Sequence, residues 1–111
     1  MPYQIGGQQV QLQDEPRNMG GPIYVPLRQV MEAIGGSLSW DGPSNTAGAT
    51  LQGRHARIPT NSSTITVDGQ PVDLSVPPIM DGNQVWVPVE FFDKAFGRTA
   101  LADTNTNTVT V

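Results

Sequence analysis

The chain repeats itself at an offset of 62 residues (88 − 26). Residues 25–35 read VPLRQVMEAIG, and residues 87–97 read VPVEFFDKAFG. Without a gap, the same offset aligns turn, cap and core residues elsewhere in the chain: Gly7 with Gly69, Val10 with Val72, Leu12 with Leu74, Pro16 with Pro78, Asp41 with Asp103, and Asn45 with Asn107. Similarity at a fixed period indicates a duplicated supersecondary unit. No nucleophile, base or set of metal ligands recurs with it, which favours a structural over a catalytic role.

Length and composition predict one domain made mainly of short strands. A chain of 111 residues is long enough to bury one modest core without a metal or a disulfide. Its hydrophobic content is low at 37%, whereas 12 glycines and 10 prolines provide many turns. We therefore expect a single domain over residues 1–111, with internal repeats at about 3–62 and 65–111.

Hydrophobic patterning predicts an α+β fold of two related ββαββ-type repeats that share one core. Each repeat begins with a hairpin around a glycine turn, followed by a loop, a short strand and a helix. The helices are expected at about 27–34 and 89–96, each with proline at the first helical position. The loops are expected at 13–22 and 75–83. One repeat by itself, about 50–60 residues long, would be only marginally stable, so the two repeats are expected to share one core.

Two apolar stripes orient the helices, and the strands that follow them differ in side-chain size. The first stripe is Leu27, Val30, Met31 and Ile34; the second is Val89, Phe92 and Phe96. Leu38 and Trp40 alternate with serines, so both are expected to be buried in the core. Ala100 and Ala102 stand in their place in the second repeat, opposite the larger helix residues. Small strand residues opposite large helix residues keep the total side-chain volume of the core similar, as expected when two halves pack together.

Charge and cysteine content exclude several classes of protein. The net charge is −4, from 6 basic against 10 acidic residues, with no basic stripe. Nucleic acid and anionic membrane surfaces are therefore poor partners. There is no cysteine, hence no disulfide or thiolate site, and no apolar run of the roughly 20 residues that a membrane span needs. The first residues do not form a signal peptide, and both ends resemble cuts in a longer chain, so an export signal is expected outside this fragment.

The motif of the first repeat resembles a known family. Residues 24–41, YVPLRQVMEAIGGSLSWD, are similar to the copper amine oxidase N-terminal-like domain, also called the stalk domain. The second copy departs from the pattern, because Glu90 replaces the arginine and the tryptophan is missing. The resemblance covers nearly the whole chain. It implies an α+β module of exported bacterial envelope proteins that accompanies domains such as wall amidases, without copper or catalysis of its own.

The residues themselves offer little for catalysis or metal binding. His55 is the one histidine, whereas copper sites bring several imidazole, thiolate or thioether ligands together. Asp14 and Glu15 are adjacent in a loop, where their side chains do not converge. Asp41 and Asp103 occupy turns, in which aspartate bonds its own backbone. We expect no enzyme activity, no cofactor and no metal.

Five residues are candidates for ligand binding. Tyr24 and Trp86 occupy the same repeat position and point away from their apolar strand neighbours. Either they are exposed and stack on sugars or a partner, or they pack under the long loops. Arg54, His55 and Arg57 form the one basic cluster, either a solvated strand face or a contact for an anionic wall polymer. Arg28 and Glu32, spaced i,i+4, are expected to pair on the helix surface.

The leading functional hypothesis is a non-catalytic accessory or stalk module of a secreted or cell-envelope bacterial protein. It would position or dock a neighbouring functional domain, such as a wall amidase, at the cell wall. The alternative is a ligand-binding module that recognises peptidoglycan, another glycan or a protein partner through exposed aromatics. Exposed edge strands also leave self-association open.

Overall fold

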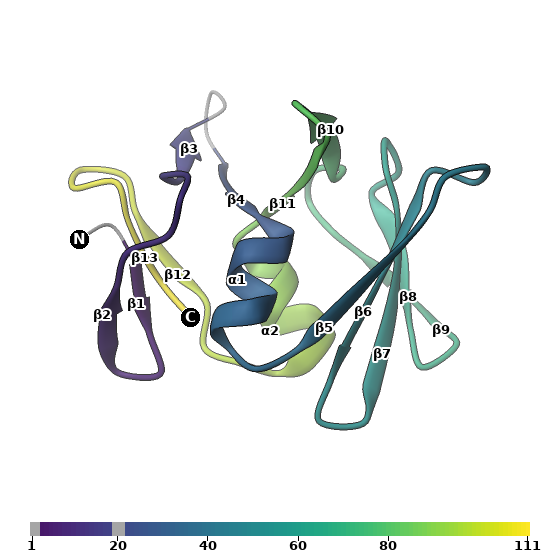
Figure 1. The fold of residues 1–111 in the computed structure, drawn as a ribbon, viewed down its shortest axis with the longest axis horizontal. Helices are drawn as coiled ribbons and strands as arrows, with labels where there is room; N and C mark the ends of the chain where they lie inside the picture. The colour runs from purple at the N-terminus through teal and green to yellow at the C-terminus, as the bar shows by residue number, and fades with distance from the viewer. Residues whose placement is uncertain (1–2, 19–21) are drawn as a thin grey trace.

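Two sheets enclose a pair of helices, and a third sheet covers one end of the helices (Figure 1). The computed structural model describes residues 3–18 and 22–111. The expected loop 13–22 therefore falls partly outside the described residues, as do Met1 and Pro2. Within the described ranges the chain is mostly strand with two short helices, which confirms the α+β class. Neither of these helices is long and apolar enough to cross a membrane.

Each of the three sheets combines strands from both halves of the chain. The first has the order β12-β13-β1-β2, the second β10-β11-β4-β3, and the third β5-β6-β7-β8-β9. The strands of the first sheet are β1 (Tyr3–Ile5), β2 (Gln8–Val10), β12 (Leu101–Asp103) and β13 (Thr108–Thr110). Those of the second are β3 (Arg17–Asn18), β4 (Ile23–Pro26), β10 (Ile79–Asp81) and β11 (Gln84–Pro88). The third contains β5 (Ser37–Asp41), β6 (Thr46–Leu51), β7 (Arg54–Pro59), β8 (Thr64–Val67) and β9 (Gln70–Asp73).

Most neighbouring strands are antiparallel, but β1 and β13 are parallel. Tyr3 lies opposite Val109, so the segments nearest the two ends of the chain are side by side in one sheet. Backbone bonds extend this contact, since Gly6 N donates to Val111 O at 3.0 Å and Val111 N donates to Gln4 O at 2.8 Å. The five-stranded sheet lies on the opposite side of the helices (Figure 1).

The two helices follow β4 and β11 directly and lie near their predicted positions. They are α1 (Leu27–Ala33) and α2 (Glu90–Phe96). Pro26 and Pro88 each lie before the first helical residue: Pro26 is the N-cap of α1, and Pro88 ends β11. The prediction that proline takes the first helical position was therefore wrong, since proline precedes it by one residue in α1 and by two in α2. Proline still fits there, because its fixed φ leads an extended strand into a helix and its missing N–H costs no helical bond.

The buried helix residues form one core with the inner faces of the sheets. In α1 the predicted stripe is confirmed at Leu27, Val30 and Met31, while Ile34 is half-buried. In α2 the predicted stripe is confirmed at Val89 and Phe92, whereas Phe96 is only partly buried, and Phe91 and Ala95 are buried as well. The three phenylalanine rings pack edge to face, with the Phe91 centroid 5.0 Å from that of Phe92 and 5.7 Å from that of Phe96. This aromatic cluster lies in the shared core or packs against it.

Two predicted loops contain short strands, β3 and β10. Neither segment is long enough to show the alternation of apolar and polar residues that predicts a strand, since β3 has 2 residues and β10 has 3. Both pair with buried central strands: Arg17 lies opposite Tyr24, and Met80 opposite Val85. Pairing with a strand already in place stabilises segments too short to be strands alone.

The turn that follows α1 is closely packed at Gly36. Gly36 N donates to Met31 O at 2.8 Å, and the chain then enters β5. A Cβ atom at Gly36 would overlap Met31 Cε and lie 2.8 Å from the backbone oxygen of Thr50. We expect Gly36→Ala to lower the free energy of unfolding by about 1–3 kcal/mol, because the backbone of β6 must shift.

Urea unfolding followed by circular dichroism will measure this loss. The matched control is Gly42→Ala, where the nearest atom, Trp40 Nε1, is 3.8 Å from the added carbon. This control is expected to change the stability by less than about 0.5 kcal/mol. Equal effects of the two substitutions would contradict close packing at Gly36.

Candidate functional site

Tyr24 and Trp86 lie on the central sheet, and both are buried. Tyr24 is 5% exposed and Trp86 is 1% exposed. The Tyr24 hydroxyl donates a hydrogen bond to Pro77 O at 2.7 Å, and burial, followed by the charge of Glu90, raises the pKa of Tyr24. The Arg17 guanidinium covers the Trp86 ring at 4.1 Å and pairs with the Asp81 carboxylate. The prospect that these rings are exposed for stacking was therefore wrong, and the alternative that they pack beneath the loops is what the structure has.

The reason for this burial is the position of the two rings in the sheet. They lie on β4 and β11, which pair with each other and are flanked by β3 and β10 on either side. Ile23–Pro26 is buried at every position, so both faces of β4 are covered. Alternation along a strand predicts which face a side chain points to, but not whether that face is covered.

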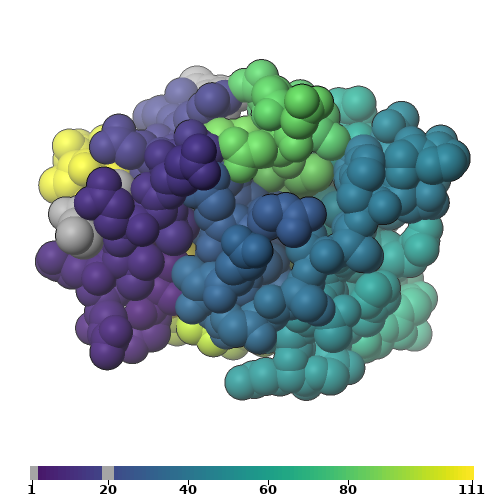
Figure 2. Space-filling view, viewed as in Figure 1, coloured from purple at the N-terminus to yellow at the C-terminus, as the bar shows by residue number. Residues whose placement is uncertain are grey.

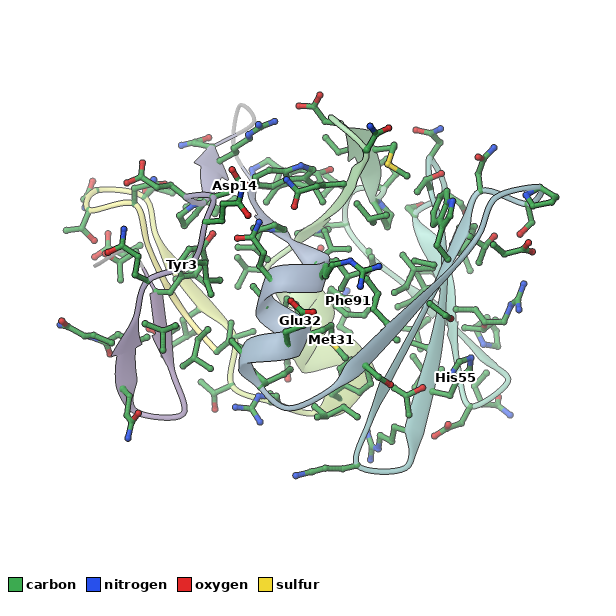
Figure 3. The ribbon with its side chains drawn as sticks, in the orientation of Figure 1. Tyr3, Asp14, Met31, Glu32, His55 and Phe91 are labelled. Atoms are coloured by element: carbon green, nitrogen blue, oxygen red, sulfur yellow. The ribbon has the colours of Figure 1, made fainter. Side chains whose placement is uncertain are left out.

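The basic cluster divides between two faces of the five-stranded sheet. Ala56 and Ile58 are buried, so His55 and Arg57 alternate with them on the outer face. The His55 ring is hydrogen-bonded through Nδ1 to Thr50 Oγ1 at 2.9 Å. Figure 3 shows His55 on this sheet, far from Tyr3 and Asp14. His55 and Arg57 thus lie on a solvated strand face.

Arg54 does not join the outer face. An added Cβ at Gly97 would lie 3.9 Å from Arg54 Nη1, which places the guanidinium at the C-terminal end of α2. A cation at this end interacts favourably with the helix dipole. Three basic residues that are near in sequence therefore do not form one anion-binding surface.

Asp14 joins the loop after β2 to the centre of the molecule. Its Oδ2 accepts hydrogen bonds from Gln84 Nε2 at 2.7 Å and from Gln29 Nε2 at 2.9 Å. The Tyr3 hydroxyl donates to the backbone oxygen of Asp14 at 2.8 Å. In Figure 3, Tyr3 and Asp14 lie beside α1. These contacts hold the loop in place, and they show no arrangement for acid–base catalysis.

The hydrogen bonds at Asp14 predict a loss of stability in acid. Those from Gln84 and then Gln29 lower the pKa of Asp14 below its usual 3.8. A carboxyl whose pKa is lower in the folded state stabilises the protein above the unfolded pKa, and this contribution disappears as the pH falls through the folded pKa. We expect Asp14→Asn to flatten the decline of unfolding free energy below about pH 4.

Urea unfolding at successive pH values will measure this slope for the native chain and the variant. Asp103→Asn is the matched control, because among the described residues the Asp103 carboxylate accepts a local turn bond alone, from Asn105 N at 2.9 Å. It should leave the slope nearly as it is. A native slope that Asp14→Asn does not alter would contradict the prediction.

A groove that the sequence did not predict lies between β5, α1 and the β10–β11 hairpin. Its volume is about 310 Å³. Trp40 is 41% exposed and Met80 is 40% exposed, and both line it. The remaining lining residues are Arg28, Leu38, Ser39, Ala47, Asn83, Gln84 and Val85. The groove is at the low end of the volumes of ligand pockets.

The expectation that Trp40 is a core residue was wrong, although its predicted face was right. Trp40 lies opposite Ala47 on the inward side of the sheet. However, β5 is an outer strand of its sheet, and beyond it the described residues leave a groove instead of a further layer. The predicted pair of Arg28 with Glu32 is also absent from the described residues, where Arg28 lines the groove without an ion pair.

Comparison with known proteins identifies the family. The family profile described as "Copper amine oxidase N-terminal domain" matches residues 4–111, almost the full chain. The chain belongs to this family. A curated relative, the primary amine oxidase of Klebsiella aerogenes, is 26% identical over 72 residues, which is 65% of this chain. The match spans 10% of that enzyme, so this copper amine oxidase N-terminal domain corresponds to a small part of a much larger protein.

The residues of this copper amine oxidase N-terminal domain do not fit a copper site. Within the described ranges, no three histidine, cysteine, aspartate or glutamate side chains come together in a way that could hold a metal ion. The sequence contains one histidine and no cysteine. His55 is exposed, and its Nδ1 is engaged with Thr50. The donor set that copper prefers is therefore missing from this part of the chain.

Proposed function

We propose that this domain is a non-catalytic accessory module of an exported bacterial envelope protein. The observation that carries the proposal is the family match over residues 4–111, an N-terminal domain that forms a small part of a larger enzyme in the curated relative. In the described residues, the Asp14 carboxylate accepts hydrogen bonds from the amides of two glutamines, Gln29 and Gln84, which hold the loop in place. The module would position or dock a neighbouring domain, such as a wall amidase, at the cell wall.

The positions of the two chain ends favour a lateral attachment over an end-to-end spacer. Tyr3 pairs with Val109 in the β1–β13 ladder, so any residues before and after the domain leave from the same sheet. The module measures 35 × 29 × 23 Å, and its five-stranded sheet lies on the far side of the helices (Figure 1). An insert of this shape extends sideways from its neighbours and presents its far side to a partner.

The proposal includes an internal duplication of one supersecondary unit. The order β1-β2-β3-β4-α1-β5-β6 is followed, after β7, by β8-β9-β10-β11-α2-β12-β13. Val25 on β4 lies opposite Val87 on β11, its counterpart at the offset of 62 residues (87 − 25). This pairing supports two units related by an approximate twofold axis, with β7 as an addition between them.

Two measurements test the absence of catalysis and copper. Calorimetric titration of the purified domain with Cu²⁺ is expected to give no uptake at micromolar affinity or tighter. Incubation with primary amines and Cu²⁺ is expected to release no peroxide above the protein-free blank. Tight copper uptake or steady peroxide release would overturn the accessory role.

Sedimentation with purified wall sacculi separates the positioning role from direct wall binding. A module that only positions its neighbours is expected to stay in the supernatant. Retention that is lost at high salt and in His55→Ala with Arg57→Ala would instead assign wall binding to the outer strand face. Because Tyr24 and Trp86 are buried, they offer no stacking platform in either case.

A further inference from the structure

The groove lined by Trp40 and Met80 lies where the outer strands of two sheets approach each other. β5 is an outer strand of the five-stranded sheet, and β10 is an outer strand of the central sheet. Both contribute to the groove wall, with Ser39 and Trp40 from β5 and Met80 from β10. No described residue pairs with the free side of either strand. An outer strand with free backbone N–H and C=O groups can pair with an added strand.

The groove gathers apolar side chains that are rare on the rest of the surface. Trp40 and Met80 are two of three large hydrophobic residues that the described part of the chain exposes; the third, Leu101, lies on β12. Leu38, Ala47 and Val85 complete the apolar lining. In the space-filling view, α1, the β10–β11 hairpin and β5 meet on one face of the molecule (Figure 2). Tryptophan, methionine and arginine are enriched at the centres of protein interfaces.

The arginine at the rim gives the groove a charge preference. Arg28 is exposed at the rim and forms neither an ion pair nor a hydrogen bond with the described residues, whereas Arg17 and Lys94 pair with carboxylates. The chain as a whole carries a net charge of −4. A single free guanidinium beside an apolar groove favours a carboxylate on the bound partner.

We propose that this groove binds an extended acidic segment of a partner protein by strand addition to β5. Backbone hydrogen bonds would form along the free side of β5, over its five residues Ser37–Asp41. Alternate side chains of the segment would enter the groove, an apolar one between Trp40 and Met80 and an acidic one against Arg28. A saccharide could stack on the indole, but it lacks the regularly spaced N–H and C=O groups that form a ladder with β5.

A positional-scanning library of acetylated nonapeptides, passed over the immobilised domain, tests the proposal. We expect the retained peptides to favour a large apolar residue with Glu or Asp two positions away, and to exclude proline near these positions. Arg28→Glu and Trp40→Ala are each expected to weaken binding of the best peptide about tenfold or more by calorimetry. Leu101→Ala is the matched control, because it removes an exposed apolar residue from a different outer strand and should leave the affinity unchanged.

Three results would overturn the proposal: retention of no peptide, retention without a preference for acidic residues, or an affinity that Arg28→Glu does not reduce. Circular dichroism and the urea midpoint of each variant will show that the fold is intact, as expected for exposed positions. Binding of sacculi that depends on Trp40 while peptides are not retained would also overturn it, in favour of a glycan. The accessory role proposed above would stand in either case, since it rests on the family match.

Discussion

Replacement of Trp86 by alanine is expected to lower the free energy of unfolding by about 3–5 kcal/mol. Trp86 is the largest of the fully buried side chains, and it lies on β11 in the middle of the central sheet. Its removal leaves a cavity inside the protein. It also removes the ring on which the Arg17 guanidinium packs while it pairs with Asp81. Domains of this size have unfolding free energies of about 5–15 kcal/mol, so the loss would consume much of the total.

The chain provides a control of the same residue type. Trp40→Ala removes an equally large ring, but that ring is 41% exposed at the edge of its sheet. It should cost roughly 1–2 kcal/mol, less than Trp86→Ala, since 41% of the residue is already exposed to water and its removal leaves no enclosed cavity. Urea unfolding of both variants, monitored by far-ultraviolet circular dichroism, will measure the two losses. A larger loss for Trp40→Ala than for Trp86→Ala would contradict the burial of Trp86 and the partial exposure of Trp40.

Cutting the chain between residues 62 and 63 is expected to abolish cooperative folding of both pieces. Every sheet joins the two halves: β7 pairs with β8, β13 with β1, and β11 with β4. The separated pieces would retain only small sets of strands and one helix each, with the core faces open to water. Isolated hairpins and domains of about 50–60 residues are at best marginally stable.

The measurement is thermal unfolding of residues 1–62, residues 63–111 and their equimolar mixture. We expect no sigmoidal transition for either piece alone. A transition near that of the intact chain should return when the two are mixed at high concentration. A cooperative transition in one isolated piece would contradict the interlocked arrangement and would indicate two independent units.

Local patterns predicted most elements of this fold. The helices at 27–34 and 89–96 were placed within one residue of α1 and α2 at each end, because proline, an apolar stripe and glycine define a helix locally. The hairpin at Gly6-Gly7 was also predicted, because two glycines with positive φ produce a tight turn between alternating segments. β3 and β10 were missed, since they exist only through pairing with β4 and β11.

The candidate site could not be read from the sequence, because exposure depends on layers contributed by distant segments. Trp86 and Trp40 both alternate with apolar or small neighbours on strands; periodicity predicted that Trp40 is in the core and left Trp86 either exposed or packed beneath the loops. In the structure Trp86 lies in a central strand covered on both faces, whereas Trp40 lies on an outer strand beside a groove.

The sequence by itself determined the helices, the hairpin turns and the family, because each depends on residues close together along the chain. Only the tertiary structure decided which half supplies each strand of a sheet, which aromatic ring meets water, and which cations form ion pairs. Those properties depend on the order in which strands assemble across the whole chain. Strand order follows from the burial of the shared core, which no local pattern encodes.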